Sequence, residues 1–66
     1  MKRYVFVCFS EYAFYISSWL LVNTIEFRCY PMQIAGCDSW QFEVFTNLDI
    51  ISDALSEYIH GKVYLE

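Results

Sequence analysis

Residues 4–22, "YVFVCFSEYAFYISSWLLV", form a long apolar run that follows a Met-Lys-Arg start. Glu11 is the only residue in it with a formal charge. A bilayer span needs about 20 predominantly apolar residues, so this run is long enough to cross a membrane once. The alternative is a buried strand followed directly by a helix, as in a small globular domain.

The position of Glu11 argues against the membrane span. It would lie near the bilayer centre, where a lone charge costs on the order of 3 kcal/mol. A cleaved signal peptide is not indicated either, because "SSWLLVNTIEF" (17–27) has bulky residues where a cleavage site needs small ones. We therefore predict a strand and a helix, and the alternative is a single-span small membrane protein that crosses through residues 4–22.

The composition of the run fits a strand and a helix. Residues 3–9 ("RYVFVCF") are β-branched and aromatic on both faces, as in a central strand. Ser10 offers a capping hydroxyl for a helix over residues 11–22, and Glu11 places an acid in its first turn. Five residues at helical spacing are expected to pack on the sheet: Tyr12, Ala13, Ile16, Trp19 and Leu20.

Three later segments predict two further strands, a loop between them and a last strand. Residues 24–30 ("TIEFRCY") and 40–46 ("WQFEVFT") alternate between apolar and polar residues, which is typical of half-buried strands. Pro31 is expected to end the first of them, and residues 31–39 to form a loop. Residues 62–66 ("KVYLE") predict a short last strand. The side chains expected to face inward are Ile25, Phe27, Cys29, Trp40, Phe42 and Val44.

Residues 47–61 ("NLDIISDALSEYIHG") predict a second helix. Asn47 is a suitable N-cap, Asp49 lies in the first turn, and Gly61 provides a C-terminal stop. An apolar stripe at helical spacing comprises Ile50, Ile51, Ala54, Leu55, Tyr58 and Ile59.

The order of these elements predicts one small α+β domain over residues 1–66. Strand, helix, strand, strand, helix, strand is the ferredoxin-like βαββαβ pattern, a four-stranded antiparallel sheet with two helices on one face. The alternative is an antiparallel β-meander with one C-terminal helix, because "YAFYI" (12–16) has high strand propensity. The ferredoxin-like architecture serves many functions and indicates none by itself.

The chain has more apolar side chains than a core of its size can hide. Its 66 residues are 58% hydrophobic and 21% aromatic, whereas average usage is about 45–50% apolar. Small domains bury a smaller fraction of their surface than large domains do, so the surplus apolar side chains are expected to face a partner. The predicted partner-binding residues are Phe14, Tyr15, Leu21, Val22, Glu26, Arg28, Tyr30, Glu43, Phe45 and Tyr64.

Charge and cysteine content narrow the range of partners. The net charge is −4, so the chain repels phosphate and nucleic acid is not an expected partner. The three cysteines are an odd number, which favours a reducing cytoplasm over a disulfide-bonded secreted domain. We expect Cys8 and Cys29 to be buried thiols, and the state of Cys37 stays open.

No motif indicates catalysis, a cofactor or a metal site. No two cysteines are closer than eight residues, whereas zinc sites normally use close pairs. Nothing in the sequence places His60 beside Cys37, as a thiol nucleophile would need, and His60 is expected at a helix C-terminus. The chain is therefore not expected to be an enzyme.

These features predict a small acidic protein-protein interaction domain in the cytoplasm, with homodimerisation expected. It would be an inhibitor or adaptor that sterically blocks a partner protein, as do small proteins that phages and mobile elements encode against host enzymes. That comparison rests on size and composition alone. The alternative function is a homodimeric small-ligand-binding module with a pocket between sheet and helices.

Overall fold

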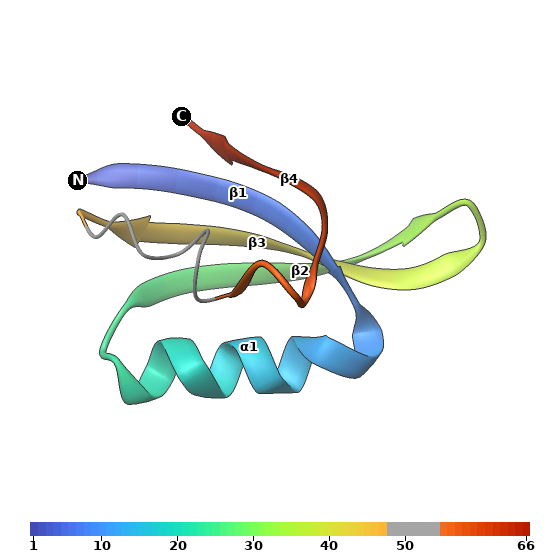
Figure 1. Ribbon diagram of the computed structural model, residues 1–66, viewed down its shortest axis with the longest axis horizontal. Coiled ribbons are helices and arrows are strands. Elements are labelled where there is room, and N and C mark those ends of the chain that lie inside the picture. The colour runs from blue at the N-terminus through green and yellow to red at the C-terminus, as the bar shows by residue number, and fades with distance from the viewer. Residues whose placement is uncertain (48–54) are drawn as a thin grey trace.

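A computed structural model describes residues 1–47 and 55–66 of the chain. Its elements are β1 (Lys2–Phe9), α1 (Ser10–Val22), β2 (Glu26–Ile34), β3 (Cys37–Thr46) and β4 (Ile59–Leu65). The four strands form one antiparallel sheet in the order β2-β3-β1-β4. The helix α1 lies along one side of this sheet, which we call the inner face (Figure 1).

The predicted ferredoxin-like βαββαβ fold with two helices is wrong. The described residues contain a single helix, in the order β-α-β-β-β. Residues 48–54 of the predicted second helix lie outside the described residues. The last part of this predicted helix is replaced by a turn at 56–58 and by β4, which begins at Ile59. The alternative, a β-meander with one helix, fits the sheet, although the helix lies between the first two strands.

β4 forms where a helix was expected because pairing with β1 overrides local helix propensity. Ile59 pairs with Cys8, and His60 pairs with Val7. This pairing completes the hydrogen bonding of β1, which otherwise would be an edge strand next to β3. The register shifts between Val5 and Val7, so β4 bulges around Gly61, which has φ +88°.

β1 is a central strand, as predicted, and the structure decides which of its sides is internal. Tyr4, Phe6 and Cys8 are buried on the inner face. The alternate residues of β1, namely Val5, Val7 and Phe9, are half-buried on the opposite, outer face. The sequence alone left both arrangements open, because the two sides of β1 are equally apolar.

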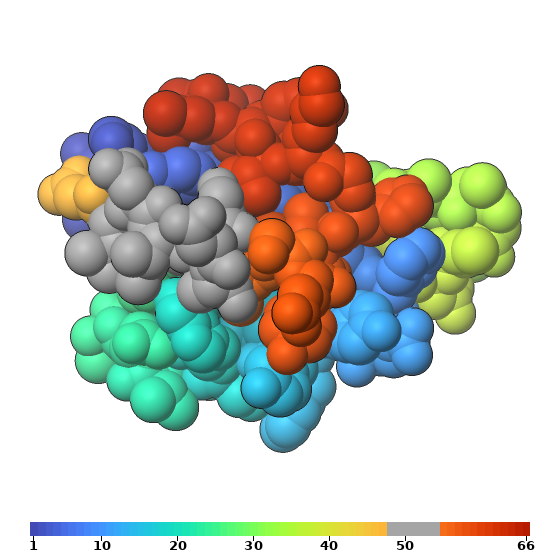
Figure 2. Space-filling model, in the orientation of Figure 1, coloured from blue at the N-terminus to red at the C-terminus, as the bar shows by residue number. Residues whose placement is uncertain are grey.

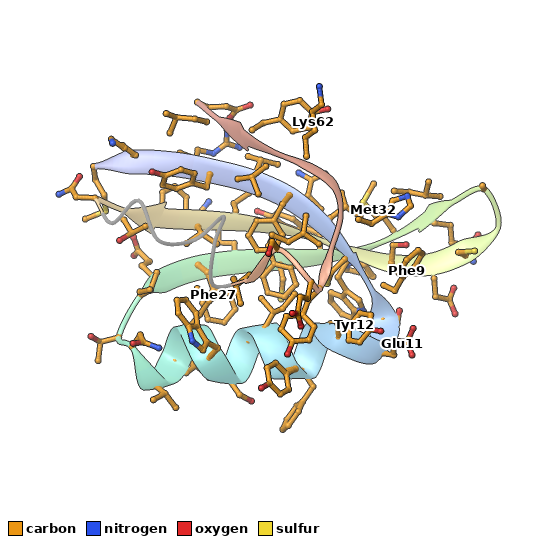
Figure 3. All side chains as sticks on the ribbon, in the orientation of Figure 1. Phe9, Glu11, Tyr12, Phe27, Met32 and Lys62 are labelled. Atoms are coloured by element: carbon orange, nitrogen blue, oxygen red, sulfur yellow. The ribbon has the colours of Figure 1, made fainter. Side chains whose placement is uncertain are left out.

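The core lies between α1 and the inner face of the sheet. Phe6 and Phe42 stack at its centre with ring centroids 5.4 Å apart, and Phe27 stacks on Phe42 at 5.9 Å. Ile16 and Leu20 of α1 are fully buried against these rings. The predicted inner side of the helix is confirmed, because Ala13, Trp19 and Tyr12 also pack against the core; Figure 3 shows Tyr12.

The ends of α1 differ from each other in how they are held. The helix begins at Ser10, directly after β1, and its N-cap is Phe9, so the predicted Ser10 cap is wrong. At the other end, the Asn23 side-chain amide donates a 2.8 Å hydrogen bond to the Trp19 carbonyl oxygen. The Ile25 amide donates to Leu20 at 2.9 Å, which leads the chain back to the sheet.

The loop predicted over residues 31–39 is instead a β-hairpin. β2 continues through Pro31, which an edge strand tolerates because its amide nitrogen needs no partner on the open side. Ile34 pairs with Cys37, which leaves a two-residue turn at Ala35–Gly36. Both turn residues have positive φ, 51° and 80°, as a type I′ turn requires. The hairpin projects beyond the start of α1 (Figure 1).

The turn predicts a stabilising substitution. Ala35 adopts a left-handed conformation that disfavours alanine and that asparagine tolerates. We expect Ala35→Asn to raise the free energy of unfolding by about 0.5–1 kcal/mol, measured by urea denaturation. Gly36→Ala is the matched control: a Cβ meets no atom within 4 Å there, so its expected loss reflects the φ of +80° alone. A destabilised Ala35→Asn variant contradicts the assigned turn.

Adjacent leucines test the orientation of α1. Leu20 is fully buried and Leu21 is 66% exposed. Leu20→Ala is expected to lose about 2–5 kcal/mol of unfolding free energy, because a cavity forms in the core. Leu21→Ala is expected to change it by less than about 0.5 kcal/mol. Similar losses at both positions in urea titrations contradict the described helix orientation.

Candidate protein-binding surfaces

The structure separates the ten predicted partner-binding residues into two groups on opposite sides of the domain. The helix surface comprises Phe14, Tyr15, Leu21 and Val22 on the side of α1 that faces away from the sheet. The sheet surface lies on the outer face and comprises Glu26, Arg28, Tyr30, Glu43, Phe45 and Tyr64. Since the core lies between them, the ten residues form two surfaces rather than one.

The helix surface is apolar and strongly exposed. Phe14 is 83% exposed and Val22 is 82% exposed, and Leu21 and Tyr15 are also exposed. Glu11 is the only charged residue of α1 and lies in its first turn (Figure 3). The helix forms one edge of the molecule in the space-filling view, which leaves this side open (Figure 2). Nine of the thirteen helix residues are apolar, and only one side of a helix can contact a sheet.

A shallow groove runs along the helix surface. Its volume is about 280 Å³, and its lining comprises Phe14, Tyr15, Ser18, Trp19 and Val22. Ser18 and Trp19 were not among the predicted partner-binding residues. Their place at helical spacing between the predicted residues is the signal that could have identified them.

Contacts with Tyr58 hold Tyr15 in place on this surface. The two rings are 4.8 Å apart, and Tyr58 also packs against Tyr12 at 5.4 Å. A hydrogen bond with Tyr15 raises the pKa of the Tyr58 hydroxyl, and partial burial and nearby charge add to the effect. Tyr15 therefore presents its ring in a fixed orientation while remaining 56% exposed.

The sheet surface combines aromatic rings with ordered charges. Arg3 donates two hydrogen bonds to Glu43 Oε2, from Nε at 3.1 Å and from Nη2 at 2.9 Å, and it also pairs with Glu66. The Arg28 guanidinium lies 5.8 Å from the centroid of the Phe45 ring. Exposed ion pairs contribute little to stability, so these contacts describe how the side chains are arranged on this face and are not a main source of folding free energy.

Two exposed tyrosines and an apolar strip complete the sheet surface. Tyr30 on β2 is 43% exposed and Tyr64 on β4 is 61% exposed. Between these edge strands lie the half-buried outer side chains of β1. In the part of the chain that the structure describes, no helix packs on this face. Arg3 was not among the predicted partner-binding residues, because its contact with Glu43 depends on the pairing of β1 with β3.

The structure does not bring Cys37 and His60 together. Cys37 begins β3 in the projecting hairpin, whereas His60 lies in β4 on the far side of β1. The predicted place of His60 at a helix C-terminus is wrong, because His60 lies in β4. Its ring packs against Phe9 with centroids 4.7 Å apart. Within residues 1–47 and 55–66, no three His, Cys, Asp or Glu side chains gather as metal ligands would.

Burial makes Cys8 a structural thiol. It is fully buried, and this burial raises the pKa of the thiol from 9.0 to about 11, with a further contribution from neighbouring Cys29. A protonated thiol is a poor nucleophile, so Cys8 contributes packing rather than reactivity. Cys29 is half-buried and Cys37 is exposed, and both are free thiols.

The space between α1 and the sheet is filled by side chains. Phe6, Phe42, Ile16 and Leu20 occupy it and are at most 1% exposed. A pocket at this place, as the ligand-binding alternative expected, is therefore not present among the described residues.

The helix is also too short to cross a bilayer. It has 13 residues, and among the residues described here no helix reaches the length and hydropathy that a membrane span requires.

The chain matches no protein-family description, and no curated protein is significantly similar to it. The two surfaces must therefore be interpreted from their own chemistry.

The raised pKa of Cys8 predicts an alkaline loss of stability. The unfolded chain releases the thiol proton near pH 9.0 and the folded chain near pH 11, so the unfolded state binds fewer protons between these values. The free energy of unfolding is thus expected to fall as pH rises across this range. Cys8→Ala is expected to be less stable at pH 7 but to show a smaller decline, measured by urea denaturation. If Cys8→Ala shows the same decline as the unsubstituted protein, the raised pKa is not that of Cys8. Cys37→Ala, at an exposed thiol, is the matched control and is expected to keep the full decline.

Proposed function

We propose that this chain is a small acidic protein-protein interaction domain that binds another protein through its sheet surface and sterically blocks it, as an inhibitor or adaptor. The observation that carries the proposal is a sheet face that no helix of the described residues covers and on which two arginines contact neighbouring side chains. These contacts are the ion pair of Arg3 with Glu43 and the cation–π contact of Arg28 with Phe45.

The residue types on this face support protein recognition. Tyr and Arg dominate the binding energy of protein interfaces, and Tyr30, Tyr64 and Arg28 are exposed at both edges of the sheet. Their attachment to strands limits the conformational freedom that is lost on binding. The apolar strip on β1 supplies a central area, and the charged residues around it supply a polar rim.

Charge indicates the kind of partner. The chain has a net charge of −4, and the sheet surface carries Glu26 together with Glu43 and Glu66, of which the last two pair with Arg3. A basic protein surface would complement these carboxylates, and its association would be accelerated at low ionic strength. The three free cysteines favour a reducing compartment, so we place this interaction in the cytoplasm.

Substitution of exposed residues on the sheet surface tests the proposal. We expect Arg28→Ala and Tyr30→Ala each to weaken binding of the captured protein at least tenfold, because both remove residue types that dominate interfaces. The measurement is affinity capture on immobilised chain, identification of the bound protein, and titration of the purified protein against each variant.

The matched control is Lys62→Ala, an exposed cation at the outer edge of β4 that is not one of the residues of the sheet surface (Figure 3). It is expected to leave the affinity unchanged. A bound protein whose affinity is the same for Arg28→Ala, Tyr30→Ala and Lys62→Ala rules out the sheet surface as the binding site.

A further inference from the structure

The apolar residues of the helix surface are arranged symmetrically about Ser18. Phe14 and Val22 each lie four residues from it, and Tyr15 and Leu21 each lie three residues from it. These spacings place all five on one side of α1. The four large side chains are 56–83% exposed, whereas Ser18 between them is small.

We propose that the helix surface joins two copies of this chain in a twofold-symmetric dimer, with antiparallel α1 helices crossing at Ser18. In such an interface, contacts occur in pairs, so that residue i of one copy meets residue j of the other and the reverse. Here Phe14 meets Val22 of the other copy, Tyr15 meets Leu21, and Ser18 meets its own equivalent. This surface is separate from the sheet surface, so the inference does not rest on the proposed function.

The sizes of the side chains suit this arrangement. The aromatic residues lie in the N-terminal half of the surface and the aliphatic residues in the C-terminal half. Antiparallel pairing therefore puts each large ring against a smaller side chain, whereas parallel pairing would put ring against ring. The small Ser18 lets the two helices approach closely, and the antiparallel helix dipoles attract one another.

The area is sufficient for a dimer. With about 200 Å² for an aromatic and about 150 Å² for an aliphatic side chain, the exposed fractions leave about 500 Å² of apolar surface per copy. Two copies would bury about 1,000 Å², which is the lower bound for a specific interface, so we expect a Kd of about 1–100 µM.

Charge favours a second copy over a lipid surface. Helices that lie on membranes carry Lys and Arg on their polar side, but α1 has neither. Its single charge, Glu11, is seven residues from Ser18. In the dimer the two Glu11 residues would be about 21 Å apart along the helices, beyond the Debye length at physiological salt, so their repulsion is screened.

The dimer would direct its two sheet surfaces outward. The helix surface and the sheet surface lie on opposite sides of the domain, so the sheet surfaces of two copies joined through α1 remain free. Such a dimer is bivalent and would bind a partner that has repeated sites more tightly than a single copy would.

Complementary charges at one predicted contact test the dimer. Phe14→Lys and Val22→Glu each place two charges in the interface, and each variant alone is expected to be a 7.9 kDa monomer by light scattering. An equimolar mixture is expected to regain a species of twice that mass, because one contact then pairs the introduced lysine with the introduced glutamate and the other is unchanged. Monomeric unsubstituted protein at about 1 mM, or no recovery on mixing, overturns the proposal. Circular dichroism confirms that both variants fold.

Disulfide formation tests the position of the twofold axis independently. In a Cys37→Ser background, which removes the exposed native thiol, Ser18→Cys is expected to form a covalent dimer on mild oxidation. Glu11→Cys is the matched control, because it is exposed on the same side of α1 but far from its equivalent in the dimer. Equal crosslinking at both positions, or none at Ser18→Cys, overturns the antiparallel arrangement. Arg28→Ala is expected to stay dimeric, which separates failure of this dimer from failure of the proposed function.

Discussion

The packing of α1 on the inner face of the sheet determines which side chains are buried and which are left exposed. The stacked rings of Phe6 and Phe42 receive Ile16 and Leu20 from the helix, and Leu55 fills the remaining space. Each fully buried apolar side chain stabilises the fold by about 1.5–3 kcal/mol. Few such side chains fit into a domain of this size, so most of its stability comes from this single layer of contacts.

Both candidate surfaces follow from that packing. A helix with apolar residues on all sides can bury only the side that meets the sheet, so Phe14, Leu21 and Val22 are left in solvent. A sheet covered on one face by α1 leaves Phe45 and the tyrosines of the edge strands on the other. The surplus of apolar side chains is thus divided between a purely apolar surface on the helix and a mixed surface on the sheet. The first suits a second copy of the chain, and the second suits a charged partner.

Local patterns predicted the parts of the fold that local physics controls. Alternation identified the inner sides of β2 and β3, and helical spacing identified the inner side of α1. The hairpin was missed because Ala35 is not a residue that turn chemistry favours, and because an edge position cancels the usual effect of Pro31. The start of β4 was missed because pairing with β1, a contact distant in sequence, determines it. The exposed residues were identified correctly on the helix, but their division into two surfaces depends on strand order, which no local pattern encodes.

In the proposed dimer, α1 alone mediates contact between the two copies, and the sheet surface stays free. Amide chemical shifts recorded over a dilution series of ¹⁵N-labelled protein test it most directly. We expect concentration-dependent shifts along Phe14–Val22, centred on Ser18, and constant shifts for Arg28, Tyr30 and Phe45. Shifts that change on the sheet surface, or that stay constant along the helix, would contradict it.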